Sequence, residues 1–130
     1  MHPDAPLFFD RRPEFLPLYD VFESAVQARF PDCGIRVQKT QISFDAPGLF
    51  ACISLPRRKA DNGLIVSIFL AAPVESARML HRTEPYPGRW THHLLLGCEE
   101  EIDSELMGWL EEAHAFALSK RRTRAGKHAL

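Results

Sequence analysis

The 130-residue sequence contains only three cysteines, Cys33, Cys52 and Cys98, and none of them belongs to a CxxC pair. This spacing excludes a zinc knuckle and a thioredoxin-type redox site. No apolar run approaches the roughly 20 residues that a membrane-spanning helix needs. The first residues also lack the basic start and apolar core of a secretory signal. We therefore expect a cytoplasmic protein that does not associate with membranes.

Motifs of well-known catalytic sites are missing too. The sequence has no phosphate-binding glycine loop, no GxSxG nucleophile motif and no HExxH metal motif. Two histidines are adjacent, His92 and His93, but neighbouring residues on a strand point to opposite faces and cannot share a metal ion. We expect no cofactor and no metal site, and a binding module is favoured over an enzyme.

The composition is that of a globular protein, with 45% hydrophobic and 25% charged residues. The length predicts a single domain, 1–130, with an ordered body over about 7–118. Charge is unevenly distributed, because residues 36–92 hold eight Lys and Arg against four Asp and Glu, between two acidic flanks. Residues 120–130 hold five basic and no acidic side chains, which predicts a flexible basic tail. Nucleic-acid contact is expected only through that tail.

Hydrophobic periodicity predicts an α+β fold. The pattern indicates a mainly antiparallel sheet of four to five strands, with an N-terminal and a C-terminal helix on one of its faces. The expected helices cover about 16–30 and about 103–118, with Asp103 as the N-cap of the second. The expected strands are 35–44 with a break near Lys39, 49–55, 64–70 and 90–96. Residues 71–90 are expected to form a long connection with a short helix at about 74–81.

The segment Arg89-Trp90-Thr91-His92-His93 is the first candidate for a binding site. It lies where the long connection is expected to meet a strand, and Arg89 with one histidine could bind an anion beside the Trp90 ring. On a strand Trp90 and His92 share one face, so only one of the two histidines can take part. The alternative interpretation is a core tryptophan flanked by half-exposed strand histidines.

Basic residues in two turns are the second group of candidates. Lys39 and Thr40 lie where the apolar phase of the strand breaks, and a bulge there could direct Lys39 into a site. Arg57 opens the cationic turn Arg57-Arg58-Lys59, which could contact a phosphate. The alternatives are an edge-strand lysine that prevents aggregation and a turn that is charged only for solubility.

Several motifs resemble those of the DUF5655 family, a group of small bacterial domains. They are Lys39-Thr40-Gln41-Ile42-Ser43-Phe44, Phe50-Ala51, Pro87-Gly88-Arg89-Trp90-Thr91-His92-His93 and the helix that contains Ile102-Asp103-Ser104-Glu105-Leu106, Trp109-Leu110 and Ala113. The resemblance spans roughly residues 7–118. The plan of the chain is more distantly similar to the DUF1801 or YdhG-like proteins, some of which are described as frataxin-like iron chaperones.

Three functions from different classes are compatible with these features. The first is a module that binds an anionic ligand at the sheet edge and the 71–90 loop, through Lys39, Thr40, Arg57, Arg89, Trp90, His92 or His93. The second is a protein–protein or homodimerisation module that uses an edge strand or the Leu7–Phe9 arm. The third is a frataxin-like metal-handling protein. The sequence does not predict the oligomeric state.

Overall fold

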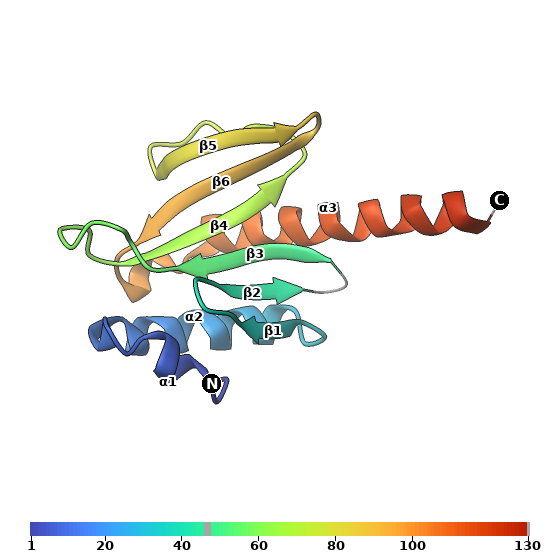
Figure 1. Ribbon diagram of the computed structural model, residues 1–130. Coiled ribbons are helices and arrows are strands. Elements are labelled where there is room, and N and C mark those ends of the chain that lie inside the picture. Colours follow the sequence, from blue (N-terminus) through green and yellow to red (C-terminus); the bar gives the residue numbers. More distant parts are fainter. Residues whose placement is uncertain (46–47, 130) are drawn as a thin grey trace.

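A computed structural model of the protein describes residues 1–45 and 48–129, with side chains up to Lys120. The elements follow the order α1 (Ala5–Phe8), a 3-10 turn (Pro13–Phe15), α2 (Leu16–Arg29), β1 (Gly34–Val37), β2 (Ile42–Asp45), β3 (Leu49–Ser54), β4 (Leu64–Leu70), β5 (Met79–Tyr86), β6 (Arg89–Leu96), a second 3-10 turn (Glu99–Glu101) and α3 (Ser104–Ala129). The predicted α+β fold is confirmed (Figure 1).

The strands form one antiparallel sheet in the order β1-β2-β3-β4-β6-β5. It has six strands, and the prediction of four to five was therefore wrong. The additional strand is β5, which replaces the long connection and the short helix expected within 71–90. Most of its residues are exposed, and Pro85 lies near its end, so the apolar alternation that reveals a buried strand is absent.

Both long helices pack on the same face of the sheet, behind it in the view of Figure 1. Phe50 of β3 connects the two layers, because its ring lies 5.2 Å from that of Phe30 after α2 and 5.4 Å from that of His114 in α3. Phe22 of α2 meets Phe44 of β2 edge to face at 5.6 Å. The core therefore lies between the helices and one face of the sheet, and no described helix covers the other face.

Two irregular positions decide which side chains reach the core. The strand break near Lys39 is a tight turn, closed by the Gln38 N–H donating to the Gln41 carbonyl at 2.8 Å. A bulge lies further along, where Phe44 pairs with Ala51 but Asp45 pairs with Leu49. The bulge inserts Phe50, which is why Phe50 and its neighbour are both buried. The expected strands 35–44 and 49–55 leave a hairpin turn at 45–48, of which residues 46 and 47 lie outside the described residues.

The last helix begins as predicted. The Asp103 Oδ1 atom accepts a hydrogen bond from the Leu106 N–H at 2.9 Å and so caps the first turn of α3. The helix continues to Ala129, past residue 118 where we expected it to end. The side chains of residues 121–130 lie outside the described part, and the flexibility of the 120–130 tail stays a prediction. In the described part of the chain, no helix is long and apolar enough to cross a membrane.

Candidate functional site

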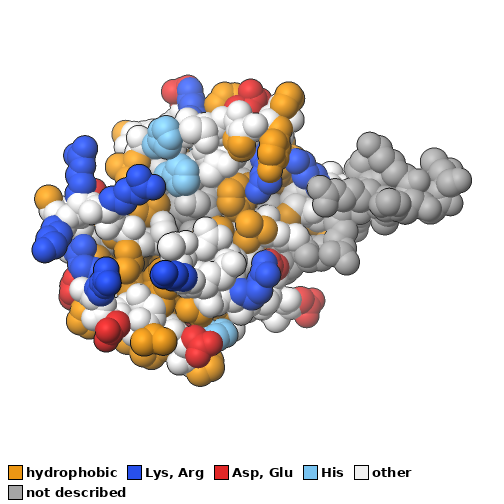
Figure 2. All heavy atoms as spheres, in the orientation of Figure 1, with side chains coloured by type: hydrophobic (Ala, Val, Ile, Leu, Met, Phe, Trp, Pro, Cys, Tyr) orange, Lys and Arg blue, Asp and Glu red, His pale blue; other side chains and the backbone are white. Residues whose placement is uncertain are grey.

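The uncovered face of the sheet carries a row of polar side chains. Residues that alternate with the core positions point away from the helices. Strand pairing places six of them side by side across all six strands: Arg36, Ser43, Cys52, Ser67, His93 and His81. Figure 2 shows this face with histidine side chains on its upper half, Lys and Arg spread across it, and Asp and Glu mainly at its edge. We call these six residues the polar row.

A serine and a histidine form the centre of the polar row. The Ser67 Oγ and His93 Nδ1 atoms are 2.7 Å apart, and the His81 ring stacks on the His93 ring at 5.7 Å with an interplanar angle of 15°. Burial lowers the pKa of His93, and the neighbouring His81 and His92 lower it further. A neutral His93 can accept a hydrogen bond from the Ser67 hydroxyl at Nδ1, and in that tautomer its other ring nitrogen carries a proton that can be donated to a ligand.

Arg89 is a cation at the end of this face where the chain turns from β5 into β6. Its guanidinium lies 4.6 Å from the Phe69 ring centre and 5.4 Å from that of Tyr86, and its Nη1 atom donates to the Tyr86 hydroxyl at 3.0 Å. It forms no ion pair with a described carboxylate. The aromatic rings fix the position of the guanidinium but leave its positive charge uncompensated. Arg89 can therefore attract an anion.

The structure does not bring all the predicted residues together. Lys39 and Thr40 form the tip of the β1–β2 turn, and Arg57 lies in the β3–β4 turn, both at the end of the sheet opposite to Arg89 (Figure 1). The single pocket of Lys39, Arg57 and Arg89 that the sequence suggested is not assembled. Arg89 and His93 share the uncovered face, as the alternation of a strand requires.

Trp90 and His92 lie on the other face, among the helix-side residues. His92 is fully buried, and its Nε2 atom accepts a hydrogen bond from the Val74 N–H at 2.9 Å. Arg82 donates to the carbonyl of the same Val74 at 3.0 Å and stacks near Trp90 at 6.0 Å. These contacts fasten the 71–78 segment to the sheet. Both residues therefore have structural roles in this arrangement.

His92 should make the stability of the protein depend on pH. Burial lowers its pKa, with a further contribution from Arg82, whereas the unfolded chain keeps the ordinary value of about 6.5. Between these two pKa values the unfolded state binds more protons than the folded state. The free energy of unfolding therefore has its highest value above about pH 6.5 and falls as the pH drops toward the lowered pKa of the folded state. Urea denaturation at several pH values measures this loss.

The His92→Gln variant isolates the contribution of this residue. The amide oxygen of glutamine can replace the Nε2 acceptor for the Val74 N–H but does not titrate. We expect a smaller loss of stability toward acid than in the wild type, with the remainder reduced further by His93→Gln, since the pKa of His93 is lowered as well. An unchanged pH dependence in both variants would show that neither histidine is the cause.

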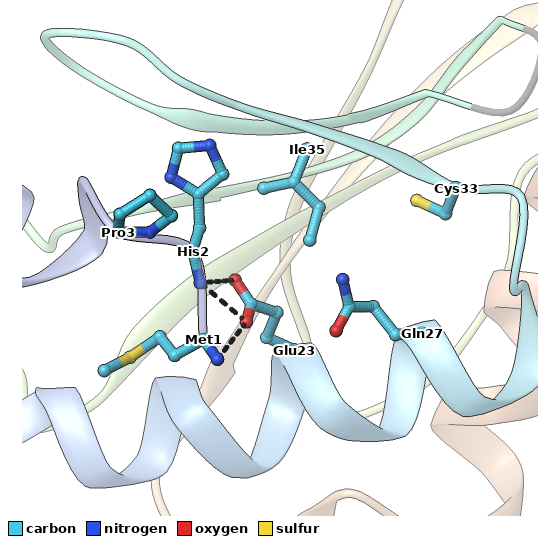
Figure 3. A pocket seen from close by; sticks show the side chains of 7 residues that line it. All are labelled: Met1, His2, Pro3, Glu23, Gln27, Cys33 and Ile35. Carbon is cyan, nitrogen blue, oxygen red and sulfur yellow. Dashed lines mark hydrogen bonds and ion pairs between the residues drawn. The ribbon is translucent and has the colours of Figure 1, made fainter.

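A hollow of about 310 Å³ lies elsewhere, between the first residues, α2 and β1 (Figure 3). Glu23 of α2 points into it and is 1% exposed. Its carboxylate accepts hydrogen bonds from the His2 N–H at 3.0 and 3.1 Å and from the Tyr19 hydroxyl at 2.9 Å, and the amino group of Met1 lies 3.5 Å away. Because its oxygens already have these partners, Glu23 holds the N-terminal segment rather than a ligand.

Reasoning from the sequence missed Ser67 as the neighbour of His93, and it missed Ser43 and Cys52 as further members of the polar row. They come from β2, β3 and β4, and nothing in the sequence gives the strand order that aligns them. The three cysteines are free thiols, and burial raises the pKa of Cys52 to about 11, so this thiol keeps its proton. Among the described residues, no three His, Cys, Asp or Glu side chains are arranged to hold a metal ion.

The comparisons with known proteins bear on family only. Neither the curated proteins nor the solved structures include a match to this sequence. One family model matches residues 5–117, a range that includes α2, the whole sheet and the first part of α3. Its description is "Domain of unknown function (DUF5655)". The motifs that suggested this resemblance all lie within the matched range, and the chain belongs to the DUF5655 family.

Proposed function

We propose that this domain binds an anionic ligand on the uncovered face of its sheet, at Arg89 and the Ser67–His93 pair. The observation that carries the proposal is the uncompensated charge of Arg89, which points to the same face as the polar row and lies against Phe69 and Tyr86. The ligand's negative charge would meet the guanidinium, and Ser67 with His93 would supply hydrogen bonds. No covalent chemistry is included.

Three other arginines on or beside the strands, Arg36 on the uncovered face and Arg78 and Arg82 on the helix side, are less available for a ligand. Arg36 forms an ion pair with Asp45 at 3.2 Å, and Arg82 pairs with Glu75 at 2.6 Å. Arg78 reaches both Asp103 and Glu105 at 3.0 Å. Each of these guanidinium groups would have to exchange an internal partner for the ligand. Arg89 exchanges only water and the Tyr86 hydroxyl.

A thermal-shift measurement at low salt tests the proposal with adenosine monophosphate and inorganic pyrophosphate as probes. A probe at about 100 times its Kd should stabilise the fold by about 2.7 kcal/mol, which raises the melting temperature by several degrees. Arg89→Ala should abolish the rise. Arg58→Ala is the matched control, because it removes the same charge from the turn at the opposite end of the sheet.

Acidity should strengthen this binding. A bound anion favours the protonated form of His93, whose pKa is lowered in the free protein, so affinity, once corrected for protonation of the probe's own phosphate near pH of about 6, should increase as the pH falls toward the lowered pKa. If neither probe raises the melting temperature, or if Arg89→Ala and Arg58→Ala reduce the shift equally, the proposed site is wrong.

Association with another protein is the competing function, and the structure gives it less support. The edge strand β5 has register shifts on both sides of the His81–Thr83 stretch and contains Pro85, and both features disfavour pairing with a second edge. Phe9 of the predicted arm is fully buried, although Leu7 is 78% exposed. Light scattering over a dilution series separates the two functions, because an obligate homodimer keeps twice the mass of the monomer.

A further inference from the structure

We infer that the anionic ligand is a single-stranded nucleic acid that crosses the uncovered face of the sheet from one end to the other. This inference rests on the proposed function and names the class of its ligand. It starts from two groups of cations at opposite ends of the same sheet. The hairpin end consists of Lys39, Arg57, Arg58 and Lys59, and the Tyr86 end consists of Arg89 and Lys120.

Neither group is neutralised within the described part of the chain. None of the six side chains in the two groups forms an ion pair with a described carboxylate. At the Tyr86 end, the Lys120 Nζ atom lies 6.0 Å from the Tyr86 ring centre and Arg89 approaches the same ring, so two cations flank one exposed aromatic side chain. In the sequence, Lys120 is followed by Arg121, Arg122 and Arg124, whose side chains lie outside the described part.

The two ends are too far apart for one small ligand. Leu94 of β6 is aligned through β4 and β3 with Ile42 of β2, and Arg89 lies five residues before Leu94, about 17 Å along the strand. Lys39 lies three residues before Ile42, on the side of the Leu94–Ile42 alignment that faces away from Arg89. The separation between Arg89 and Lys39 is therefore more than about 20 Å. A single phosphate or mononucleotide reaches one end only, whereas a chain of phosphates can reach both.

The surface between the two ends suits bases rather than more phosphates. Its middle is formed by the hydroxyls and thiol of the polar row and by the stacked imidazoles of His81 and His93. The rings of Phe69 and Tyr86, the latter 53% exposed, continue this surface toward Arg89. Aromatic rings interleaved with cations bind single strands, because unpaired bases stack on the rings while the backbone meets the charges. A duplex keeps its bases inside and cannot use such a surface.

Fluorescence anisotropy with labelled oligo(dT) of about 4, 8 and 12 nucleotides tests the inference on the full chain. Affinity should increase steeply with length until the oligonucleotide reaches both ends, and then level off. For the longest oligonucleotide, Arg89→Ala and the double variant Arg57→Ala with Arg58→Ala should each weaken binding and reduce the salt slope, by about 0.7 for each phosphate that the variant no longer neutralises. For adenosine monophosphate, only Arg89→Ala should matter.

Tyr86→Ala tests the contribution of stacking, and it should weaken oligonucleotide binding about tenfold. Arg29→Ala is the control, since it removes a positive charge at the end of α2, where Arg29 pairs with Glu111 of α3, and should leave the affinity unchanged. If inorganic polyphosphate or a duplex of equal length binds as tightly as oligo(dT), stacking of unpaired bases is not the mode of recognition and the inference is overturned.

Three further results separate failure of the inference from failure of the proposed function. If adenosine monophosphate binds with dependence on Arg89 while oligo(dT) gains nothing with length, the small-ligand site stands and the inference fails. If oligo(dT) binds but responds only to Arg121→Ala with Arg122→Ala, the tail alone is responsible and the sheet face is not the site. If neither probe binds, both the proposed function and the inference are wrong.

Discussion

The Gly63→Ala variant is expected to be among the least stable single variants of this protein. A Cβ atom at position 63 would lie 2.3 Å from the Leu96 carbonyl oxygen and 2.9 Å from its carbonyl carbon. Both are backbone atoms of β6, which pairs with β4 from Trp90 to Leu96, so neither can move without disturbing the pairing of these two inner strands. We expect a loss of about 3 kcal/mol in the free energy of unfolding, or about 10 °C in melting temperature.

Gly108 of α3 provides the matched control for this prediction. A Cβ atom there meets nothing within 4 Å, and alanine is the better helix former by about 1 kcal/mol. Gly108→Ala should therefore leave the stability unchanged or raise it slightly. Urea denaturation of the two variants measures both values. Equal effects at the two positions would mean that the backbone of Gly63 can move away from Leu96 more easily than the paired strands suggest.

Gly63 is needed for a reason other than the usual one for its motif. An Asn-Gly pair is typical of turns in which both residues have positive φ, but no described residue other than glycine has positive φ, and Gly63 itself is near-extended at 158°. The glycine is needed because β6 passes so close to it. That contact joins residues 63 and 96, and no local pattern in either segment announces it.

The sequence predicted those elements whose burial imposes a period. The apolar residues of α2 and of β4 repeat as their packing requires, and both elements lie where we expected them. β5 was not predicted, because an edge strand with most residues exposed shows no alternation of apolar residues. Its sequence MLHRTEPY is typical of a loop. The β5–β6 turn, in contrast, is explained by Gly88, whose φ of 77° is in the left-handed region.

The candidate site, too, could be predicted from the sequence only where it depends on local patterns. Alternation along β6 is a local property, so the sequence could place Arg89 with His93 and separate both from His92. Partners from other strands depend on the order β3-β4-β6, which follows from long-range pairing. For that reason Ser67 was missed, and Lys39, Arg57 and Arg89 were grouped although the ends of the sheet keep them apart. The nucleic-acid contact that the sequence confined to the tail is now inferred for the sheet face.

Replacing Glu23 by alanine is the second change with a large expected effect. Glu23 is 1% exposed, and its carboxylate accepts hydrogen bonds from the Tyr19 hydroxyl and the His2 N–H. Burial, together with the charge of Glu23, raises the pKa of Tyr19, so the phenol keeps the proton that it donates. Alanine leaves this fully buried hydroxyl without its acceptor. The free energy of unfolding should fall by about 3 kcal/mol.

A double-mutant cycle with Tyr19→Phe shows whether the loss comes from this hydrogen bond. Tyr19→Phe alone should cost about 1–2 kcal/mol, because Glu23 keeps its contacts with the N-terminal segment. Once Glu23 is alanine, the same change should cost little, since the hydroxyl has already lost its partner, and the coupling between the two positions should be about 1 kcal/mol. Glu112→Ala, at an exposed position of α3, is the control and should change the stability by less than about 0.5 kcal/mol. Strict additivity of the two changes would mean that Glu23 stabilises the fold through its contacts with the first residues alone, and that the buried phenol finds another acceptor when the carboxylate is removed.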